Sequence, residues 1–314
     1  MDVARPAFVP DPDLSHEEMA ALQREIAAAA RFEDDAPVLE RACDGSSSPA
    51  TTGDDETERA VESGTVERGT VESGRADTER IPDTGTPETE TAHEQTAHEQ
   101  TAHEQTAQEA PFVAGVDQAF LDNRAVSAIV VVADGAVVER SHAVTPTEIP
   151  YIPGLLAFRE GRPILAAFET LETDPDLALF DGSGRIHYRQ AGLATHIGVT
   201  LDLPAIGVAK RLLCGEPADS IEEKLPAGTR VPIRADDEVD AEPGTVIGQA
   251  LQTRQFEGED RYVNPVYVSP GHRVSAGTAA EVVRRCCAGY KLPEPIRLAD
   301  RYADEVKREV ESGD

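Results

Sequence analysis

Lysine is scarce in this chain of 314 residues, and negative charge dominates. The four lysines are Lys210, Lys224, Lys291 and Lys307, and all 29 Lys and Arg together face 59 Asp and Glu, which gives a formal net charge of -30. A charge of this sign and size opposes association with phosphates, because like charges repel at a distance. Either the partner is not a nucleic acid, or the charge lies away from the surface that binds it.

The surplus of carboxylates over lysines favours a protein from a halophilic organism, with a high-salt cytoplasm. At 1 M salt the Debye length falls to about 3 Å, so surface carboxylates no longer repel DNA at a distance. The alternative is an acidic protein from a low-salt organism.

Paired cysteines and long apolar runs are also missing. The four cysteines show no CxxC spacing, which argues against a zinc site, and we expect them to be reduced: Cys43, Cys214, Cys286 and Cys287. No apolar run reaches the length of about 20 residues that a membrane span needs, and the first residues do not resemble a signal peptide. We therefore expect a cytoplasmic protein with no membrane segment.

Aromatic residues are absent from residues 34–110, which carry 20 Asp and Glu against 5 Arg, half of the net charge. Such a stretch cannot bury enough apolar surface to offset its ordering entropy, so we predict a disordered acidic insertion here. Three TAHEQ repeats within it contain His93, His98 and His103. These histidines are either a metal-binding tract or products of linker repetition, and a spacing of five residues, which does not share a helix face, favours the second.

Regular structure is predicted on both sides of this segment. Ser15 and Glu18 form a capping-box pattern before a helical stripe, so we expect residues 1–33 to contribute a helix that packs on the core. Apolar runs predict strands over 113–120, 125–133, 137–144, 177–180, 205–208, 246–252 and 262–268. Helices are expected over about 190–201, 278–287 and 296–310, and one more with Pro163 near its first turn.

An aromatic residue lies between two prolines in residues 149–160, which read IPYIPGLLAFRE. Proline fixes its own φ and restricts the residue before it, so Tyr151 is expected to sit in a stiff turn. A rigid aromatic of this kind can act as a wedge that enters a stack of bases. Glu160 follows nine residues after Tyr151.

Two further carboxylates interrupt or close apolar strands. Asp117 lies within VAGVDQAF and Asp181 ends LALFD, so the two can converge where neighbouring strands meet, with Glu160 entering from the adjoining turn. Magnesium held by carboxylates can activate water and stabilise negative charge, as phosphodiester hydrolysis requires. Spacing alone leaves a metal site and unrelated turn or surface carboxylates equally open.

Four blocks of sequence, in this order, resemble the endonuclease V family of repair nucleases. They are PYIPGLLAFRE (150–160), DGSGRIH (181–187), GLATHIGVTLDLPAIGVAKRLLCG (192–215) and SPGH (269–272). The resemblance implies an α/β fold, a ribonuclease H-like mixed sheet flanked by helices, with residues 111–314 as the endonuclease core. Three antiparallel strands followed by alternating strands and helices agree with that fold.

The resemblance also implies an activity. The expected enzyme is a monomer that uses Mg²⁺, or Mn²⁺ as the alternative ion, to hydrolyse the second phosphodiester bond 3′ to deoxyinosine in DNA. Two other possibilities stay open at this point: a ribonuclease H-like nuclease acting on inosine-containing RNA or branched DNA, and a lesion-binding module without catalysis.

The resemblance to endonuclease V also implies roles for particular residues. Asp117, Glu160 and Asp181 would bind the metal, and Lys210 and His272 would complete the catalytic set. The substrate would contact Tyr151, the wedge, and residues around an extruded base: Gly182, His187, Leu193, Gly207 and Leu213. Tyr188 replaces the proline that is usual in the family, and His196, inside an apolar helix, is expected to be a packing residue.

Overall fold

The sheet dominates the computed structural model, which describes residues 1–35, 110–147, 149–150, 152–258 and 261–313. In this part of the chain nine strands form one sheet in the order β3-β2-β1-β4-β5-β9-β8-β7-β6. The strands are β1 (Val113–Leu121), β2 (Arg124–Ala133), β3 (Ala136–Pro146), β4 (Leu177–Asp181), β5 (Ala205–Ala209), β6 (Glu216–Pro217), β7 (Arg230–Arg234), β8 (Val246–Leu251) and β9 (Val266–His272).

The sheet mixes two strand directions, as expected. β1, β2 and β3 form an antiparallel meander, β4 and β5 join it in parallel with β1, and β9 returns antiparallel to β5. The turn between β2 and β3 contains Asp134 and Gly135, whose φ angles of 49° and 74° are the left-handed values that a tight hairpin needs. The predicted α/β mixed sheet is therefore confirmed.

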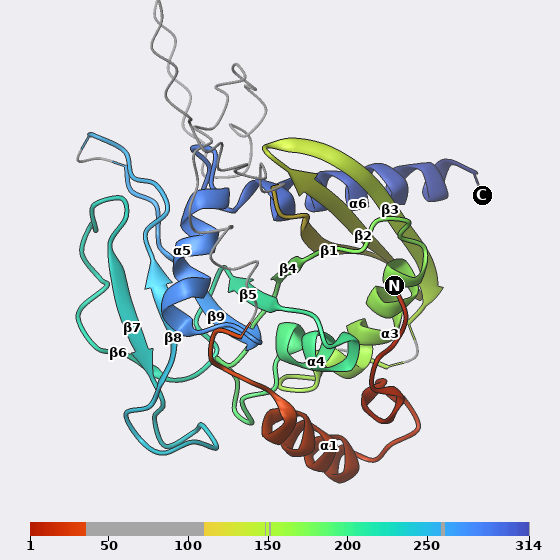
Figure 1. The fold of residues 1–314 in the computed structure, drawn as a ribbon, viewed down its shortest axis with the longest axis horizontal. Coiled ribbons are helices and arrows are strands. Elements are labelled where there is room, and N and C mark those ends of the chain that lie inside the picture. Colours follow the sequence, from red (N-terminus) through yellow and green to blue (C-terminus); the bar gives the residue numbers. More distant parts are fainter. Residues whose placement is uncertain (36–109, 148, 151, 259–260, 314) are drawn as a thin grey trace, which may run out of the picture. The chain divides into compact units, whose positions relative to one another are not determined.

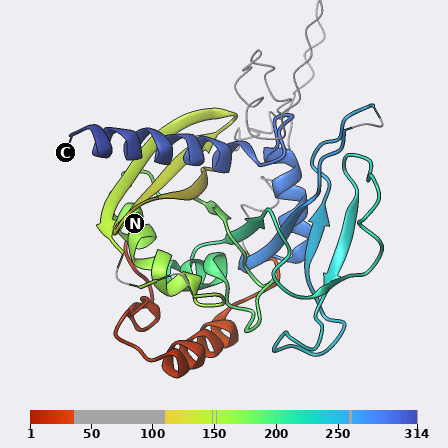
Figure 2. The same ribbon diagram turned by 180° about the vertical axis from the view of Figure 1, so that it is seen from behind.

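Helices cover both faces of this sheet (Figures 1 and 2). The helices are α1 (His16–Ala29), α3 (Leu156–Glu169), α4 (Leu193–Leu201), α5 (Ala276–Cys286) and α6 (Glu294–Gly313), and η1 (Pro6–Phe8) is a short 3-10 helix. Successive strand residues point to opposite faces: Ala114 and Val116 pack with α3 and α4, whereas Val113 packs with α5 and the start of α6.

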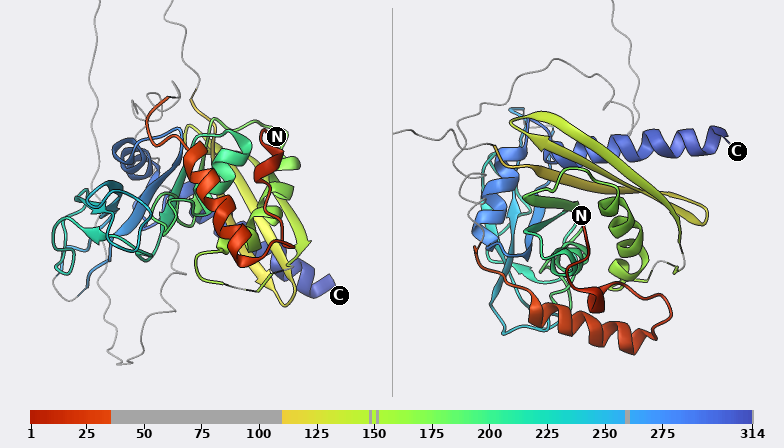
Figure 3. Two further views of the ribbon diagram at one scale, coloured as in Figure 1. Left: turned by 90° about the horizontal axis from the view of Figure 1, so that it is seen from below. Right: turned by 45° about the vertical axis from the view of Figure 1, so that its right-hand side comes forward.

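The N-terminal helix α1 lies against α4 (Figure 3). Its capping box is present, because the Ser15 side chain accepts from the Glu18 backbone and the Glu18 side chain accepts from the Ser15 backbone. The buried residues of α1 are Met19, Gln23 and Ile26, so a glutamine lies in the middle of an otherwise apolar stripe.

Several local predictions were wrong. α3 begins at Leu156, which puts Pro163 inside the helix rather than in its first turn. The strand expected over 262–268 runs instead over Val266–His272, and β6 and β7 were not predicted, because β6 is two residues long and β7 contains Pro232. The insertion predicted over 34–110 lies almost entirely outside the described residues, as do Tyr151 and Cys43. No helix among the described residues is long and apolar enough to span a bilayer.

His196 lies in α4 as a buried packing residue, as predicted. It is 0% exposed, its Nε2 donates to the Phe8 carbonyl at 2.8 Å, and its ring meets Phe158 edge to face. Burial lowers the pKa of His196 to about 4, although the bond to Phe8 acts in the opposite direction. The folded protein therefore keeps this histidine neutral at pH values at which an unfolded chain protonates it.

We predict that His196 makes the fold sensitive to acid. Between about pH 6.5 and pH 4 the unfolded chain binds the extra proton, so the contribution of His196 to the free energy of unfolding should fall as pH falls, by up to about 1.4 kcal/mol per pH unit. Chemical denaturation in molar potassium chloride should show that His196→Gln gains stability relative to wild type as pH falls. The exposed His16→Gln serves as control, and an equal slope in wild type and His196→Gln would contradict the prediction.

Candidate active site

Two carboxylates lie on the neighbouring interior strands β1 and β4, and the register of these parallel strands places them at the same level along the sheet. Val116 of β1 is paired with Phe180 of β4, so the next residues, Asp117 and Asp181, follow in the same register. Asp181 is in turn paired with Val208 of β5, two residues before Lys210. The three side chains therefore come from neighbouring parallel strands: Asp181 ends β4, Lys210 follows the end of β5, and Asp117 lies in the middle of the longer β1.

Asp117 carries the most unusual environment of the three. Its Oδ1 accepts from the Gln118 backbone at 2.7 Å, whereas its Oδ2 is buried with no hydrogen-bond partner among the described residues. Burial raises the pKa of Asp117 to about 8, with help from Asp181 and Asp300, and against the Gln118 bond and Lys210. An unpaired buried carboxylate oxygen is costly, so this atom is suited to a cation.

Glu160 reaches the cluster from helix α3, and not from a turn as predicted. The helix is tied to β1 at this point, because the Gln118 side chain donates to the Glu160 carbonyl at 3.2 Å. Burial raises the pKa of Glu160 to about 8, Arg159 lowers it, and Asp181 raises it further. Asp181 therefore acts on both of the other carboxyl groups.

Lys210 provides the positive charge at this edge. Its Nζ donates to Asp181 Oδ2 at 2.7 Å, and half of its side chain is exposed. Burial alone would lower the pKa of Lys210, but Asp181, followed by Asp117 and Asp300, raises it overall. The ammonium group therefore stays charged beside the carboxylates and open to solvent.

Asp300 of helix α6 belongs to the same electrostatic cluster, and sequence reasoning missed it. It acts on the pKa values of both Asp117 and Lys210. Gly115 explains how α6 comes so near β1: a Cβ at this position would lie 2.0 Å from the Pro295 carbonyl carbon. In the sequence, Asp300 is recognisable only as an aspartate after Ala299, which is buried in the structure. Its position along the chain gives no indication that it lies near β1.

The donor set suits a hard divalent cation. Asp117, Glu160, Asp181 and Asp300 offer only carboxylate oxygens, the ligands that magnesium and manganese prefer, and Asp117 Oδ2 lacks a partner among the described residues. Within the described residues, no three His, Cys, Asp or Glu side chains are grouped as closely as in a complete metal site. The residues therefore fit an ion by the chemistry of their donor atoms.

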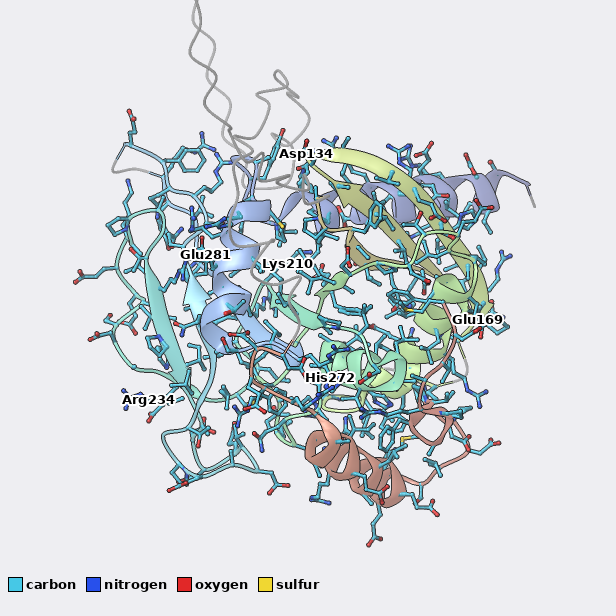
Figure 4. All side chains as sticks on the ribbon, viewed as in Figure 1. Asp134, Glu169, Lys210, Arg234, His272 and Glu281 are labelled. Atoms are coloured by element: carbon cyan, nitrogen blue, oxygen red, sulfur yellow. The ribbon has the colours of Figure 1, made fainter. Side chains whose placement is uncertain are left out.

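His272 does not lie in this cluster, so the prediction that it sits near the carboxylates was wrong. β9 runs antiparallel to β5 and pairs His272 with Ala205, at the end of β5 opposite Lys210, as the labelled side chains in Figure 4 show. His272 is 0% exposed, its Nδ1 accepts from the Arg31 backbone at 3.2 Å, and its Nε2 donates to Asp202 at 3.1 Å. It joins the N-terminal segment to the core.

A small pocket of about 60 Å³ lies beside the cluster, between the residues before α3 and the loop after β4. Three of the predicted substrate residues line it: His187, Leu193 and Leu213. Gly182 and Gly207 do not line it but support it. A Cβ on Gly207 would lie 2.4 Å from the Gly184 backbone, and one on Gly182 would lie 3.2 Å from Leu193.

The pocket lining also contains residues that sequence reasoning missed, among them Gln23, Gly154, Ser183 and Gly192. Its histidine is neutral: burial lowers the pKa of His187 to about 4. Because His187 Nδ1 accepts from the Arg189 backbone at 3.2 Å, its Nε2 carries the proton and donates to Gly154 O at 3.1 Å. The pocket is thus lined by apolar and neutral polar groups.

The sequence relatives of this chain share one family name. The family model Endonuclease V matches residues 94–301. The chain is 56% identical over 312 residues to endonuclease V of Haloarcula marismortui, covering 98% of both chains, and 47% identical over 313 residues to that of Natronomonas pharaonis, covering 100% of both. Both relatives come from halophilic archaea, in agreement with the halophilic origin predicted from the acidic composition.

Solved structures give the same result. Endonuclease V of Streptomyces avermitilis has a TM-score of 0.62 and 27% identity, with 99% of both chains covered. Endonuclease V of Ciona intestinalis, bound to a 24-mer DNA that contains an inosine followed by a ribo-adenosine, has a TM-score of 0.52 and 25% identity and covers 64% of this chain and 87% of its own.

We predict that Asp117 destabilises the fold in the absence of a cation. Its pKa is raised from 3.8 to about 8, so the folded protein holds a proton that the unfolded chain releases, and the free energy of unfolding should fall as pH rises through this window. Asp117→Asn should remove the part of this decline that Asp117 causes, while the part caused by Glu160 remains, and it should be more stable than wild type at pH 8 in EDTA. Denaturation curves at pH 5 and pH 8 provide the measurement.

The exposed Asp134→Asn, in the β2–β3 turn, is the matched control and should follow wild type at both pH values. Equal stability of Asp117→Asn and wild type at pH 8 would show that the pKa of the Asp117 carboxyl group is not raised in the folded protein.

Proposed function

Since this chain belongs to the endonuclease V family and is thus a nuclease that hydrolyses phosphodiester bonds, we propose that its target is DNA carrying deoxyinosine. We propose further that it needs a divalent metal ion, Mg²⁺ with Mn²⁺ as the alternative, and cuts the second phosphodiester bond 3′ to the lesion. The observation that carries this proposal is the place of Asp117 and Asp181 on the neighbouring parallel strands β1 and β4, together with a buried Asp117 oxygen that has no hydrogen-bond partner among the described residues.

In this proposal Asp117, Asp181 and Glu160 hold the ion. A divalent metal at this place supplies a Lewis acid and lowers the pKa of bound water, which is the chemistry that phosphodiester hydrolysis requires. The carboxyl groups of Asp117 and Glu160, with pKa values of about 8, must lose their protons to serve as ligands. Asp300 would add its negative charge to the site from α6.

Lys210 has a separate role on the substrate side. Its ammonium group hydrogen-bonds Asp181 and is half exposed, so it can turn to a phosphoryl oxygen of the strand that is cut. Fixed positive charge placed where negative charge develops stabilises the transition state. Lys210 is one of four lysines in the chain, and it sits at the carboxyl end of β5.

The pocket serves the base. An extruded hypoxanthine would enter the space lined by His187, Leu193 and Leu213, where backbone groups can approach its ring edge. Adenine would be rejected, because its amino group is a donor where hypoxanthine has a carbonyl acceptor. Tyr151 would fill the gap left in the duplex, as its place between Pro150 and Pro153 suggests.

RNA containing inosine is a second candidate substrate. The Ciona relative is bound to DNA whose inosine is followed by a ribonucleotide, so that family member accepts a 2′-hydroxyl just 3′ of the lesion. A lesion-binding module without catalysis is disfavoured, because the carboxylates and Lys210 are all present.

The first test uses one labelled strand with and without a single inosine. We expect cleavage only when inosine and Mg²⁺ or Mn²⁺ are both present, at the second phosphodiester bond 3′ to the lesion, so that the upstream product ends one nucleotide 3′ to the inosine. Gel analysis in molar potassium chloride, with an EDTA arm and a matching RNA strand, gives the measurement. Cleavage of the undamaged strand at the same rate, or cleavage in EDTA, would refute the proposal.

The second test concerns Asp300, which the structure adds to the cluster. Asp300→Asn should lower the single-turnover cleavage rate at least about tenfold, because a charge that acts at the site of reaction is lost, while affinity for inosine DNA in calcium stays near wild type. Asp117→Asn should abolish cleavage. Asp304→Asn, an exposed aspartate one turn along α6, is the control. Wild-type cleavage by Asp300→Asn would remove this residue from the site.

A further inference from the structure

Helix α1 contributes one polar side chain to the pocket that is proposed to receive the base. Gln23 is 0% exposed and is part of the pocket lining, together with Gly154, His187 and Ala191. Its neighbours on the same helix face, Met19 and Ile26, are apolar. Apolar burial alone would dock the helix, so the amide in the middle of the stripe requires another explanation.

The amide of Gln23 uses all of its main hydrogen-bonding capacity on two loops. Its Nε2 donates to Gly154 O at 2.9 Å and to Ala191 O at 3.4 Å, and its Oε1 accepts from Arg189 Nη1 at 3.1 Å. The opposite orientation of the amide would turn Oε1 toward two carbonyl oxygens, which offer no proton, so the network fixes the orientation.

The Gly154 carbonyl receives a second donor from across the pocket. Neutral His187 donates from Nε2 at 3.1 Å, so this one oxygen is held by α1 and by the loop after β4 together. Gly154 has a φ of 77°, a left-handed value that glycine adopts without strain. Two donors on one carbonyl therefore fix the turn that leads into α3, and with it the wall of the pocket.

We infer that Gln23 is a positioning residue for lesion recognition, which sets the distance between the two loops that enclose the extruded base. It holds the Gly154 side of the pocket and the Arg189–Ala191 side by the same amide. This inference rests on the proposed function, since it concerns the same pocket. It gives the N-terminal helix, which lies outside the 94–301 family match, a part in substrate recognition.

The experiment uses the full chain with Gln23→Met and Gln23→Glu. Methionine keeps the volume but has no donor, and glutamate keeps only the acceptor for Arg189. For both variants we expect KM for inosine DNA to rise about tenfold, because a lost hydrogen bond of this kind corresponds to about that change in an equilibrium constant. We expect kcat to stay within about twofold of wild type and affinity for undamaged DNA to be unchanged.

A matched control is available in another loop. Gln252 is 1% exposed, and its Nε2 donates to the carbonyls of Arg254 and Val263, both at 2.7 Å. Gln252→Met thus removes a buried amide of the same kind without touching the pocket. It should leave the preference for inosine unchanged, whatever it does to thermal stability.

Hydrogen exchange without DNA provides a readout that is independent of catalysis. Amide exchange over residues 152–158 should be about tenfold faster in Gln23→Met than in wild type, because the turn loses a donor. Unchanged exchange together with unchanged KM, or an equal loss of affinity for damaged and undamaged DNA, would overturn the inference. Lack of inosine preference in the wild-type enzyme would instead refute the proposed function, and the exchange rates would still decide the role of Gln23.

Discussion

The burial of Asp117 next to a second carboxyl group, that of Asp181, is the constraint on which the site depends. Parallel pairing of β1 with β4 brings the two carboxyl groups to the same edge, and burial makes their charge expensive. Two features reduce the free-energy cost of these buried charges: Asp117 stays protonated near neutral pH, and Asp181 forms an ion pair with Lys210. A divalent cation, as proposed above, would offset the negative charge of both carboxylates.

Charged and neutral groups are separated within the site. The reacting edge gathers carboxylates and an ammonium group, whereas the pocket beside it holds neutral His187, the amide of Gln23 and backbone groups. A neutral pocket suits a base without charge, whereas a carboxylate cluster suits a metal ion and the ammonium group of Lys210 suits a phosphate. The loop after β4 joins the two parts, because it begins at Asp181 and reaches His187 after six residues.

Sequence patterns predicted the elements that have strong periodicity and the residues that follow from strand register. The meander, its Asp134–Gly135 turn, the capping box at Ser15 and the placement of Asp117 and Asp181 all rest on local signals. Asp300 and Gln23 could not be found in this way, because each acts across a tertiary contact: α6 approaches β1 over Gly115, and α1 reaches the pocket over α4. The prediction for His272 was wrong although its motif, SPGH, was recognised. In this motif the histidine has a structural role, because it bonds to the Arg31 backbone and to Asp202.

The acidic surface also limits how this protein can hold DNA. Release of counterions by Lys and Arg usually supplies much of the affinity for DNA, and this contribution shrinks as salt rises. With a net charge of -30 and a single lysine among the site residues, the chain has little to gain from it. Under the proposed function, affinity would come from contacts that salt screens weakly: a base buried in a neutral pocket, its hydrogen bonds, and carboxylates that share an ion with the phosphate. Recognition of a lesion by burial is compatible with high salt, whereas recognition by surface charge is not.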